Sequence, residues 1–446
     1  MKSRTLGLFD LSVLGIGAII GTGILVLTGI VAAQNAGPAI ALSFLIAAIA
    51  SGFIGLCYSE LTTSLPNSGS AFFYAWVSIG NLTAFLAGWT LLGVYITTTA
   101  TVANGWTGYF ASFLKELNIV LPTKILMTPI NGGIINLPAV IMVILITIIL
   151  TRGTNESKIF NDILVLVKLA IICLFLIVSI KDINIKNYQP FFPYKISGVF
   201  SGASAVFFSF LGFDALATSA EDAKNVNKAL PRAIIISLTL STLLYVLVGL
   251  VMTGVVKYKK LNVSEAMSYV LISKNHILAA QIVSFGAILG IMAVVFAFIY
   301  AGSNILKSMS REKFLPLQFA KLSAGTKTAN YSIWLVGLIS AILAGECDLH
   351  YLALISNIGS LLVFLLISII VVIMRYKFPK LKRPFKIPGG KIIPILSVSV
   401  CIILLINISL DAWIAYFIWL VVGIVIYFLY SKKNANSFDV KLLNNA

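Results

Sequence analysis

Four glycines interrupt an otherwise apolar stretch near the start of the chain. Within residues 14–28 they are Gly15, Gly17, Gly21 and Gly23. Each interior glycine costs a helix roughly 1 kcal/mol relative to alanine, and bare backbone at membrane depth is tolerated only where it is buried in protein or lines a cavity. The pattern predicts an interrupted helix. Gly17 and Gly21 also have the four-residue spacing of closely packed helices, so helix packing remains the alternative.

An interruption between Ile19 and Gly23 would expose main-chain groups of both signs. The N–H groups of Thr22 and Gly23 would begin a half-helix whose partial positive charge suits a carboxylate. The carbonyls from Ile16 to Ile19 would accept hydrogen bonds from an ammonium group.

A second interrupted apolar stretch, residues 207–214, reads Phe-Phe-Ser-Phe-Leu-Gly-Phe-Asp. It would add carbonyls at Phe208, Ser209 and Leu211. A matched pair of interrupted spans points to the substrate site of a transporter. Donors facing acceptors at one depth predict a site for a small zwitterion.

Lys168 is a lysine deep within an apolar segment, about nine residues or ~13 Å from its nearer edge. A lysine at this depth costs about 3 kcal/mol unless it is paired or neutral. A lysine that can lose its proton in mid-membrane would couple transport to protons. A structural ammonium, or partial snorkelling of the side chain, is the alternative.

Asp214 is an acidic residue deep within the second interrupted stretch. It could balance charge, act as a gate, or determine specificity. It could also cap the half-helix that is expected to begin near Ala215, because aspartate is a preferred N-cap residue. Capping is the role we favour.

The composition places these residues in a membrane protein. Of 446 residues, 59% are hydrophobic and 11% are charged, and the mean hydropathy is +1.02. Most of the apolar segments approach the ~20 residues that a hydrocarbon core requires. Twelve such segments are centred near Ile20, Ala48, Thr98, Met142, Ile171, Phe207, Leu243, Val294, Val336, Leu362, Leu404 and Val421.

The basic residues predict the orientation. With the N-terminus in the cytoplasm, inner tails and loops carry 22 Lys and Arg, outer loops carry 9, and Lys168 lies within a span. This excess predicts that both termini are cytoplasmic in a multi-pass protein of the cell membrane.

The expected fold is all-α, with twelve transmembrane helices. If the interrupted spans are the first and the sixth, each opens a five-span unit. Because five is odd, the second unit is inverted relative to the first, as in many secondary transporters. The expected units are residues 1–185 and 186–376, followed by spans eleven and twelve (377–431) and a cytoplasmic tail (432–446).

Other classes of function lack their signatures. The sequence shows no paired carboxylates at membrane depth, no His–Glu metal spacing and no G-x-S-x-G, so an enzyme is not expected. The four scattered cysteines indicate neither a metal site nor disulfides. We expect no cofactor besides a proton gradient and no nucleic-acid partner. A membrane sensor without transport is a remote alternative, and the oligomeric state is not predicted.

Several motifs together resemble the amino acid–polyamine–organocation (APC) superfamily of permeases, and most closely its bacterial cationic amino acid transporter-like branch. The motifs are residues 15–23, 58–61 (Tyr-Ser-Glu-Leu), 69–71 (Gly-Ser-Ala), 105–109 (Gly-Trp-Thr-Gly-Tyr), 212–215 (Gly-Phe-Asp-Ala), 220–222 (Ala-Glu-Asp) and Pro231-Arg232.

The resemblance implies the inverted five-plus-five fold and a site for the α-amino and α-carboxyl groups of an amino acid. It implies that Lys168 replaces the sodium ion of sodium-coupled relatives. The implied substrate-binding residues are Ile16, Ile19, Thr22, Gly23, Phe208, Ser209 and Leu211.

One position departs from the cationic pattern. Val94 stands immediately before Tyr95, where such relatives often carry a glutamate. The sequence therefore predicts proton-coupled uptake of amino acids, with neutral side chains slightly favoured. A cationic amino acid transporter and an amino acid exchanger remain the alternatives.

Overall fold

The computed structural model describes residues 7–65, 70–153, 158–218, 223–323, 326 and 328–436. Gly69, residues 220–222 and the tail from residue 437, which the sequence analysis uses, lie outside these ranges, as does the start of the first expected unit, residues 1–6. The α-helices are α1 (Leu8–Ile19), α2 (Thr28–Val31), α3 (Ile40–Ser64), α4 (Ser70–Ser78), α5 (Asn81–Glu116), α6 (Leu137–Thr151), α7 (Lys158–Ser179), α8 (Lys195–Val206), α9 (Phe213–Thr218), α10 (Val226–Val255), α11 (Ala266–Ile272), α12 (Ile277–Arg311), α13 (Asn330–Glu346), α14 (Leu349–Lys377), α15 (Ile392–Ile406), α16 (Leu410–Ile426) and α17 (Lys432–Asn434).

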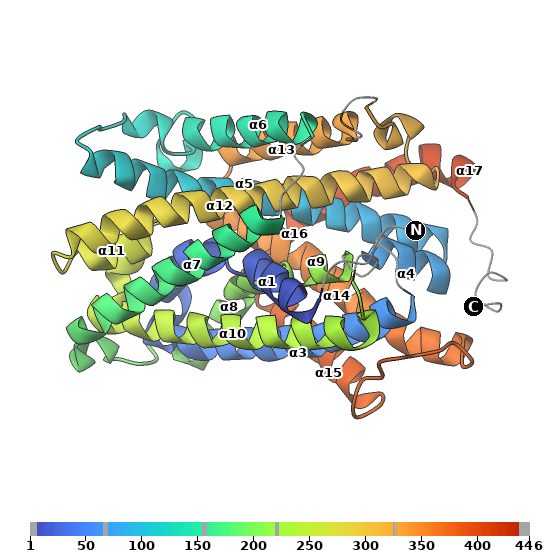
Figure 1. Ribbon diagram of the computed structural model, residues 1–446, viewed down its shortest axis with the longest axis horizontal. Helices are drawn as coiled ribbons and strands as arrows, with labels where there is room; N and C mark the ends of the chain where they lie inside the picture. Colours follow the sequence, from blue (N-terminus) through green and yellow to red (C-terminus); the bar gives the residue numbers. More distant parts are fainter. Residues whose placement is uncertain are drawn as a thin grey trace.

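The helices agree with the predicted apolar segments. Most of the long ones run along the long axis of the molecule (Figure 1). In the described part, seven helical stretches are long and apolar enough to cross a membrane, and five further apolar helices are shorter. Two predicted centres, Ile20 and Phe207, fall where α1 and α8 end. The all-α class is confirmed, while the twelve crossings, the inverted repeat and the unit boundaries stay predictions.

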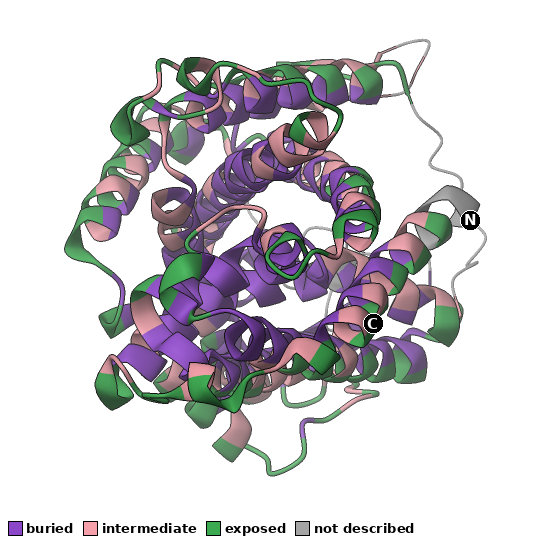
Figure 2. Ribbon diagram, turned by 90° about the vertical axis from the view of Figure 1, so that its left-hand side faces the viewer, coloured by how far each residue is buried: buried purple, intermediate pink, exposed green. Residues whose placement is uncertain are grey.

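Burial separates central helices from peripheral ones. In the most apolar window of α5, 89% of residues are buried, whereas the window that covers α16 is only 22% buried. Figure 2 shows buried residues gathered inside and exposed ones around the rim. The exposed side chains include strongly apolar ones such as Ile406 and Leu429, each 75% exposed. An exposed surface of this composition suits lipid rather than water.

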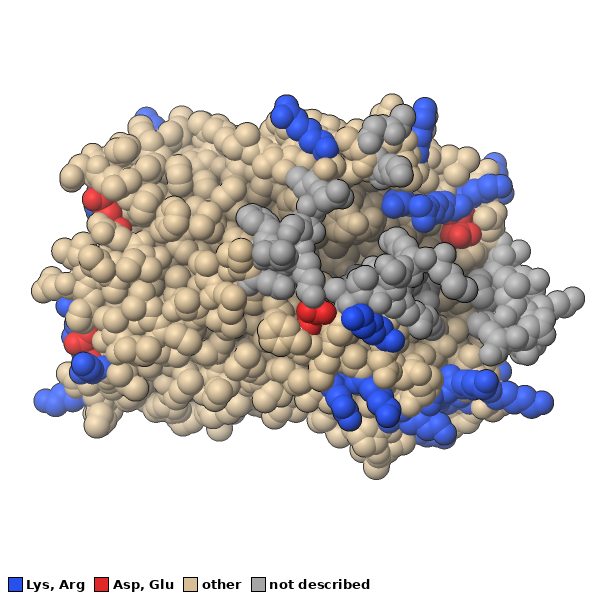
Figure 3. All heavy atoms as spheres, viewed as in Figure 1, with Lys and Arg blue, Asp and Glu red and all other residues tan. Residues whose placement is uncertain are grey.

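The basic residues are distributed unevenly. Figure 3 shows more Lys and Arg side chains toward the end that holds α4 and α17 than toward the end that holds α11. The last turn of α14 and the segment that joins it to α15 together carry seven Lys and Arg, from Arg375 to Lys391.

Candidate functional site

The first interruption lies inside the predicted interval. α1 ends at Ile19, and Ile20 has an extended backbone with φ −75° and ψ 105°. The chain then forms a π-helix, η1 (Gly23–Leu27), before α2 begins. The new half-helix is therefore π-helical at its start, and π-bulges of this kind are frequent at functional sites.

The second interruption has a different geometry. After α8 the chain forms a 3-10 helix, η8 (Phe207–Phe210), and Leu211 is extended with φ −62° and ψ 141°. Gly212 then has φ +114° before α9 begins at Phe213. Only glycine adopts this backbone readily, so Gly212 fixes where α9 can start.

The two interruptions are in direct contact. A Cβ on Gly23 would lie 2.4 Å from Cβ of Ser209, and a Cβ on Gly212 would lie 2.5 Å from the carbonyl oxygen of Ala18. Each break therefore needs a glycine where it meets the other. The main-chain groups of both breaks consequently lie at one place inside the protein, as the paired-break pattern predicts.

The other glycines of the first span pack against neighbouring helices. A Cβ on Gly15 would lie 2.7 Å from Cδ1 of Leu216, and one on Gly17 would lie 2.5 Å from Cγ2 of Val165. Close packing is thus real at these positions. The packing alternative named Gly17 and Gly21; Gly21 is also packed, though less tightly, because a Cβ there would lie 3.2 Å from Cγ2 of Val294. Gly23 instead lies at the contact between the breaks.

Several predicted carbonyls already accept hydrogen bonds within the chain. The N–H of Ile20 donates to the carbonyl of Ile16 at 2.8 Å, and that of Leu211 donates to the carbonyl of Phe208 at 3.1 Å. Each carbonyl oxygen retains a second lone pair. A substrate ammonium at these positions would share the acceptors with the chain itself.

Tyr245 of α10, which the sequence analysis missed, touches both breaks. Its hydroxyl lies 2.8 Å from the carbonyl oxygen of Ile19 and 2.7 Å from that of Ser209. The side chain is fully buried, and its one proton can satisfy only one carbonyl at a time. Buried tyrosine hydroxyls usually have a hydrogen-bond partner. A single tyrosine within an apolar span was therefore the signal in the sequence that could have indicated this contact.

A second tyrosine supports only the first break. Tyr109 of α5 donates to the carbonyl of Leu25, within η1, at 2.7 Å. The same helix approaches the break at Gly105, whose Cβ would lie 2.9 Å from Cγ2 of Thr22 and from Cγ2 of Val26. α5 thus forms one wall beside the unwound segment.

One polar side-chain atom beside the breaks is buried and has no hydrogen-bond partner in the described structure. It is Oγ of Ser209, a residue that is 2% exposed and lies against Gly23. Unsatisfied buried polar atoms are rare in folded proteins, so a polar ligand is a natural partner for this hydroxyl.

Lys168 of α7 contacts α1 just before the first break. Its side chain is 3% exposed, and Nζ donates to the carbonyl of Gly17 at 3.0 Å. Its aliphatic stem packs on Gly290 of α12, where a Cβ would lie 2.9 Å from Cγ. The carbonyl end of a helix carries partial negative charge, which stabilises an ammonium. None of the ion pairs in the described residues includes Lys168.

Asp214 belongs to the second break. It is 5% exposed; its Oδ1 accepts a hydrogen bond from the N–H of Gly212 at 3.2 Å, and its Oδ2 accepts one from the hydroxyl of Tyr95 at 3.1 Å. Because α9 begins at Phe213, Asp214 is the second residue of the helix rather than the residue before it. It joins the break to α5 through Tyr95.

Val94 packs against α14. Its Cγ2 lies 2.6 Å from where Gly359 of α14 would carry a Cβ. The neighbouring residue Tyr95 is the one that reaches Asp214. Of the seven predicted main-chain positions, six lie in the breaks or in the residues that flank them. The exception is Ile16, which lies one turn earlier in α1. Val94 lies against α14, the tenth predicted span.

The chemistry of the site is that of main-chain polar groups with one cation and one anion beside them. The described residues contain no cluster of three or more His, Cys, Asp and Glu that could hold a metal ion. The first N–H groups of a half-helix have no intrahelical partner, and C-terminal carbonyls complement them. The arrangement can bind a small molecule that carries both hydrogen-bond acceptor and hydrogen-bond donor groups.

Comparison with known proteins agrees with this chemistry. The family described as amino acid permease matches residues 6–438. The methylthioribose transporter of Bacillus subtilis (strain 168) is 42% identical over 435 residues, which cover 97% of this chain and 94% of that protein. The branched-chain amino acid permease BcaP of the same organism is 42% identical over 437 residues, with the same coverage.

A more distant relative comes from a plant. The vacuolar cationic amino acid transporter 4 of Arabidopsis thaliana is 32% identical over 385 residues, which cover 84% of this chain and 64% of that protein. The relatives named here are transporters that differ in the substrate their names give.

Proposed function

Because the chain belongs to the amino acid permease family of the APC superfamily, and is thus a multi-pass membrane protein, we propose that it takes up amino acids as a proton-coupled secondary transporter. The observation that carries this proposal is the direct contact between two interrupted helices, at Gly23 against Ser209. Paired broken helices supply substrate groups in such transporters.

The amino acid would be held by its α-amino and α-carboxyl groups. The N–H groups of Thr22 and Gly23 would face the carboxylate at the start of η1. The ammonium would bind the carbonyls of Ile19 and Ser209, which both lie within hydrogen-bonding distance of the Tyr245 hydroxyl. One donor is therefore shared between two acceptors, and an ammonium would supply the missing protons.

The preferred side chain is neutral in this proposal. One relative that is 42% identical is named a branched-chain amino acid permease, whereas the cationic transporter of Arabidopsis is 32% identical. Val94 also lacks the carboxylate expected for basic substrates. We therefore expect leucine, isoleucine or valine to bind better than arginine or lysine.

A second candidate substrate follows from the other relative that is 42% identical, a methylthioribose transporter. Methylthioribose has hydroxyl groups in place of the ammonium and carboxylate of an amino acid. The unpartnered Oγ of Ser209 could bind one of these hydroxyl groups. The paired main-chain donors and acceptors favour the zwitterion.

Proton coupling is assigned to Lys168. Its ammonium bonds the carbonyl of Gly17, two residues before the end of α1. Loss of the proton would remove the charge–dipole attraction that holds α1 at this place. A change in the proton on one side chain can thus shift the interrupted helix, which is the coupling that a symporter requires.

We also propose that both termini are cytoplasmic. The support is the excess of Lys and Arg at the end that holds α4 and α17 (Figure 3), which follows the rule that basic residues remain inside.

Counterflow into proteoliposomes tests the substrate class. Vesicles loaded with unlabelled leucine are expected to accumulate labelled leucine. External valine should compete strongly, arginine weakly, and isopentylamine (leucine without its carboxylate) very little. Equal competition by the amine would overturn binding of the carboxylate at η1. Competition by methylthioribose alone would replace the amino acid with the thiosugar.

A further inference from the structure

The segment that joins α14 to α15, residues 378–391, is a basic surface with a defined shape. Together with the last turn of α14 it carries Arg375, Arg383 and five lysines. The sequence contains no acidic residue between Asp348 and Asp411, so no acid of the segment itself can neutralise these charges.

One buried carboxylate fixes the shape of the segment. Glu60 of α3 is 2% exposed and accepts two hydrogen bonds from Arg375, at 2.7 Å from Nε and 2.5 Å from Nη2. It also accepts the main-chain N–H of Ile387 at 2.9 Å, and Nε of Arg383 lies 3.8 Å away. The segment is therefore folded back onto the end of α3.

Both arginines of the segment face inward. Arg383 donates to the carbonyls of Met374 and Phe378, each at 2.8 Å, and Arg375 donates to the carbonyl of Gly390 at 2.8 Å. Arginine suits such multidentate binding because its five donors have a fixed geometry. The arginines thus build the segment and are not available to an external partner.

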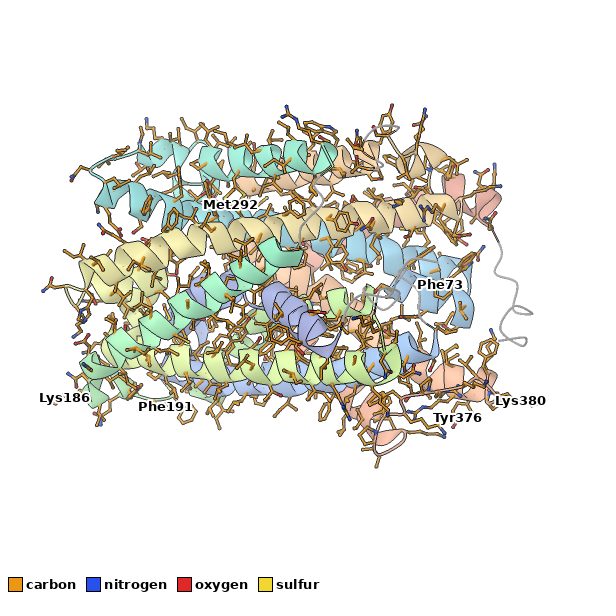
Figure 4. All side chains as sticks on the ribbon, viewed as in Figure 1. Phe73, Lys186, Phe191, Met292, Tyr376 and Lys380 are labelled. Atoms are coloured by element: carbon orange, nitrogen blue, oxygen red, sulfur yellow. The ribbon has the colours of Figure 1, made fainter. Side chains whose placement is uncertain are left out.

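The lysines, in contrast, are exposed. Among them Lys377 donates to the carbonyl of Ser78, and Lys391 lies over the ring of Tyr376. Lys380, Lys382 and Lys386 are exposed, and the contacts of Glu60 do not include them. Figure 4 labels Tyr376 and Lys380 at the lower right end of the molecule, on this segment.

An apolar surface continues directly from the lysines. α15 starts at Ile392, immediately after Lys391. Its side chains Ile392, Ile395 and Ile406 are 63%, 59% and 75% exposed. Figure 1 shows α15 at the lower edge of the molecule, where it forms part of the outer surface. A row of cations followed by an exposed apolar helix complements an amphiphile with an anionic head.

We propose that this surface binds an anionic phospholipid of the surrounding bilayer. The headgroup phosphate contacts Lys380, Lys382 and Lys386, and the acyl chains lie along the exposed face of α15. A free phosphate ion would use only the lysines, so the adjoining apolar face favours the lipid. The proposal requires a membrane protein but does not depend on which solute is transported.

Basic clusters beside a membrane helix attract anionic lipid with an affinity that grows about fivefold for each lysine. Removal of all three lysines should therefore weaken binding by up to about a hundredfold. Because the arginines and Glu60 are unchanged in that variant, the shape of the segment should persist.

Lipid titration of the purified full-length chain tests the proposal. Phosphatidylglycerol is added to the protein in neutral detergent, and bound lipid is counted by native mass spectrometry. The test variant carries Lys380→Gln, Lys382→Gln and Lys386→Gln. The matched control carries Lys257→Gln, Lys259→Gln and Lys260→Gln, three exposed lysines just before α11, at the opposite end of the molecule.

We expect the test variant to lose most of the bound phosphatidylglycerol and the control to retain it, with phosphatidylcholine bound weakly by both. Equal retention by the two variants would overturn the proposal. Displacement of the lipid by millimolar inorganic phosphate would identify a free-anion site instead. If the triple variant does not fold, the three single variants decide, each with an expected loss of about fivefold.

Discussion

The two interrupted helices meet at one place but are built differently. The first break has a π-helix after it and contains no charged residue; its charged neighbour, Lys168, comes from α7 and bonds the carbonyl of Gly17. The second break follows a 3-10 helix, has its glycine at φ +114° and carries its own acid, Asp214. The first break thus depends on a partner helix for its charge, and the second does not.

This difference suggests separate roles for the two breaks. A side chain on another helix, here Lys168, can gain or lose its proton and thereby hold or release α1. A charge within the break itself, tied to Gly212 and Tyr95, holds its own backbone in shape. We therefore expect substitutions at the first break to affect transport more than folding, and substitutions at the second to affect both.

The largest effect is expected from Gly23→Val. A Cβ there would lie 2.4 Å from Cβ and 2.5 Å from Cα of Ser209, so the breaks could not meet and uptake should be lost. Gly52→Val is the matched control, because a Cβ on Gly52 has nothing within 4 Å. Uptake of labelled leucine is measured for protein that elutes as a single peak. Normal uptake by Gly23→Val would mean that the contact between the breaks is unnecessary.

Lys168→Ala should abolish accumulation but not binding. Without the ammonium, α1 loses a partner at Gly17, and the proton gradient can no longer act through it. Accumulation in sodium-free vesicles should fall to equilibrium, whereas slow exchange continues. The native protein should lose accumulation when an uncoupler collapses the gradient.

Two results would show that Lys168 is structural. One is accumulation that persists in Lys168→Ala, and the other is accumulation by the native protein that requires sodium.

Gly212→Ala should reduce stability as well as uptake. The substitution strains a backbone at φ +114° and places a Cβ 2.5 Å from the carbonyl oxygen of Ala18. Gly80→Ala is the control, because its φ is +138° but a Cβ there has nothing within 4 Å. Backbone strain alone costs about 1–3 kcal/mol. The melting temperature should fall further for Gly212→Ala, and equal shifts would mean that the contact between the breaks adds nothing to stability.

Much of this architecture could be predicted from the sequence because it depends on composition and backbone. Long apolar segments predict helices in any membrane protein, and four glycines in a short stretch located the first break to within two residues. The contact between the breaks is a tertiary feature, but a repeat with paired interruptions implies it.

The side-chain partners could not be predicted in the same way. Tyr245 lies far from both breaks in the sequence, and only the packing of α10 brings its hydroxyl to Ile19 and Ser209. The packing of Val94 could not be predicted either. A helix turns 100° per residue, so Val94 and Tyr95 have different neighbours: Val94 packs on Gly359, and Tyr95 bonds Asp214. A role of Val94 in specificity stays a prediction.

The smallest effect is expected from Tyr245→Phe, which removes one hydroxyl and keeps the ring. The carbonyls of Ile19 and Ser209 would lose their shared donor, at a cost of about 1–3 kcal/mol. A bound ammonium can donate to both carbonyls and so replace the missing hydroxyl. The substitution should therefore mainly affect the protein before the substrate binds, when the two carbonyls have no shared donor. We expect KM for leucine to change severalfold while the maximal rate stays within about twofold.

Tyr109→Phe separates this role from general support of the helices. Tyr109 donates to Leu25 of the first break alone, so its loss removes one hydrogen bond of similar length without touching Ser209. If the bridge between the two breaks matters, KM changes in Tyr245→Phe and remains near the native value in Tyr109→Phe. Equal changes in both variants would mean that each tyrosine merely supports a helix, and that the two breaks are coupled through their direct contacts at Gly23 and Gly212.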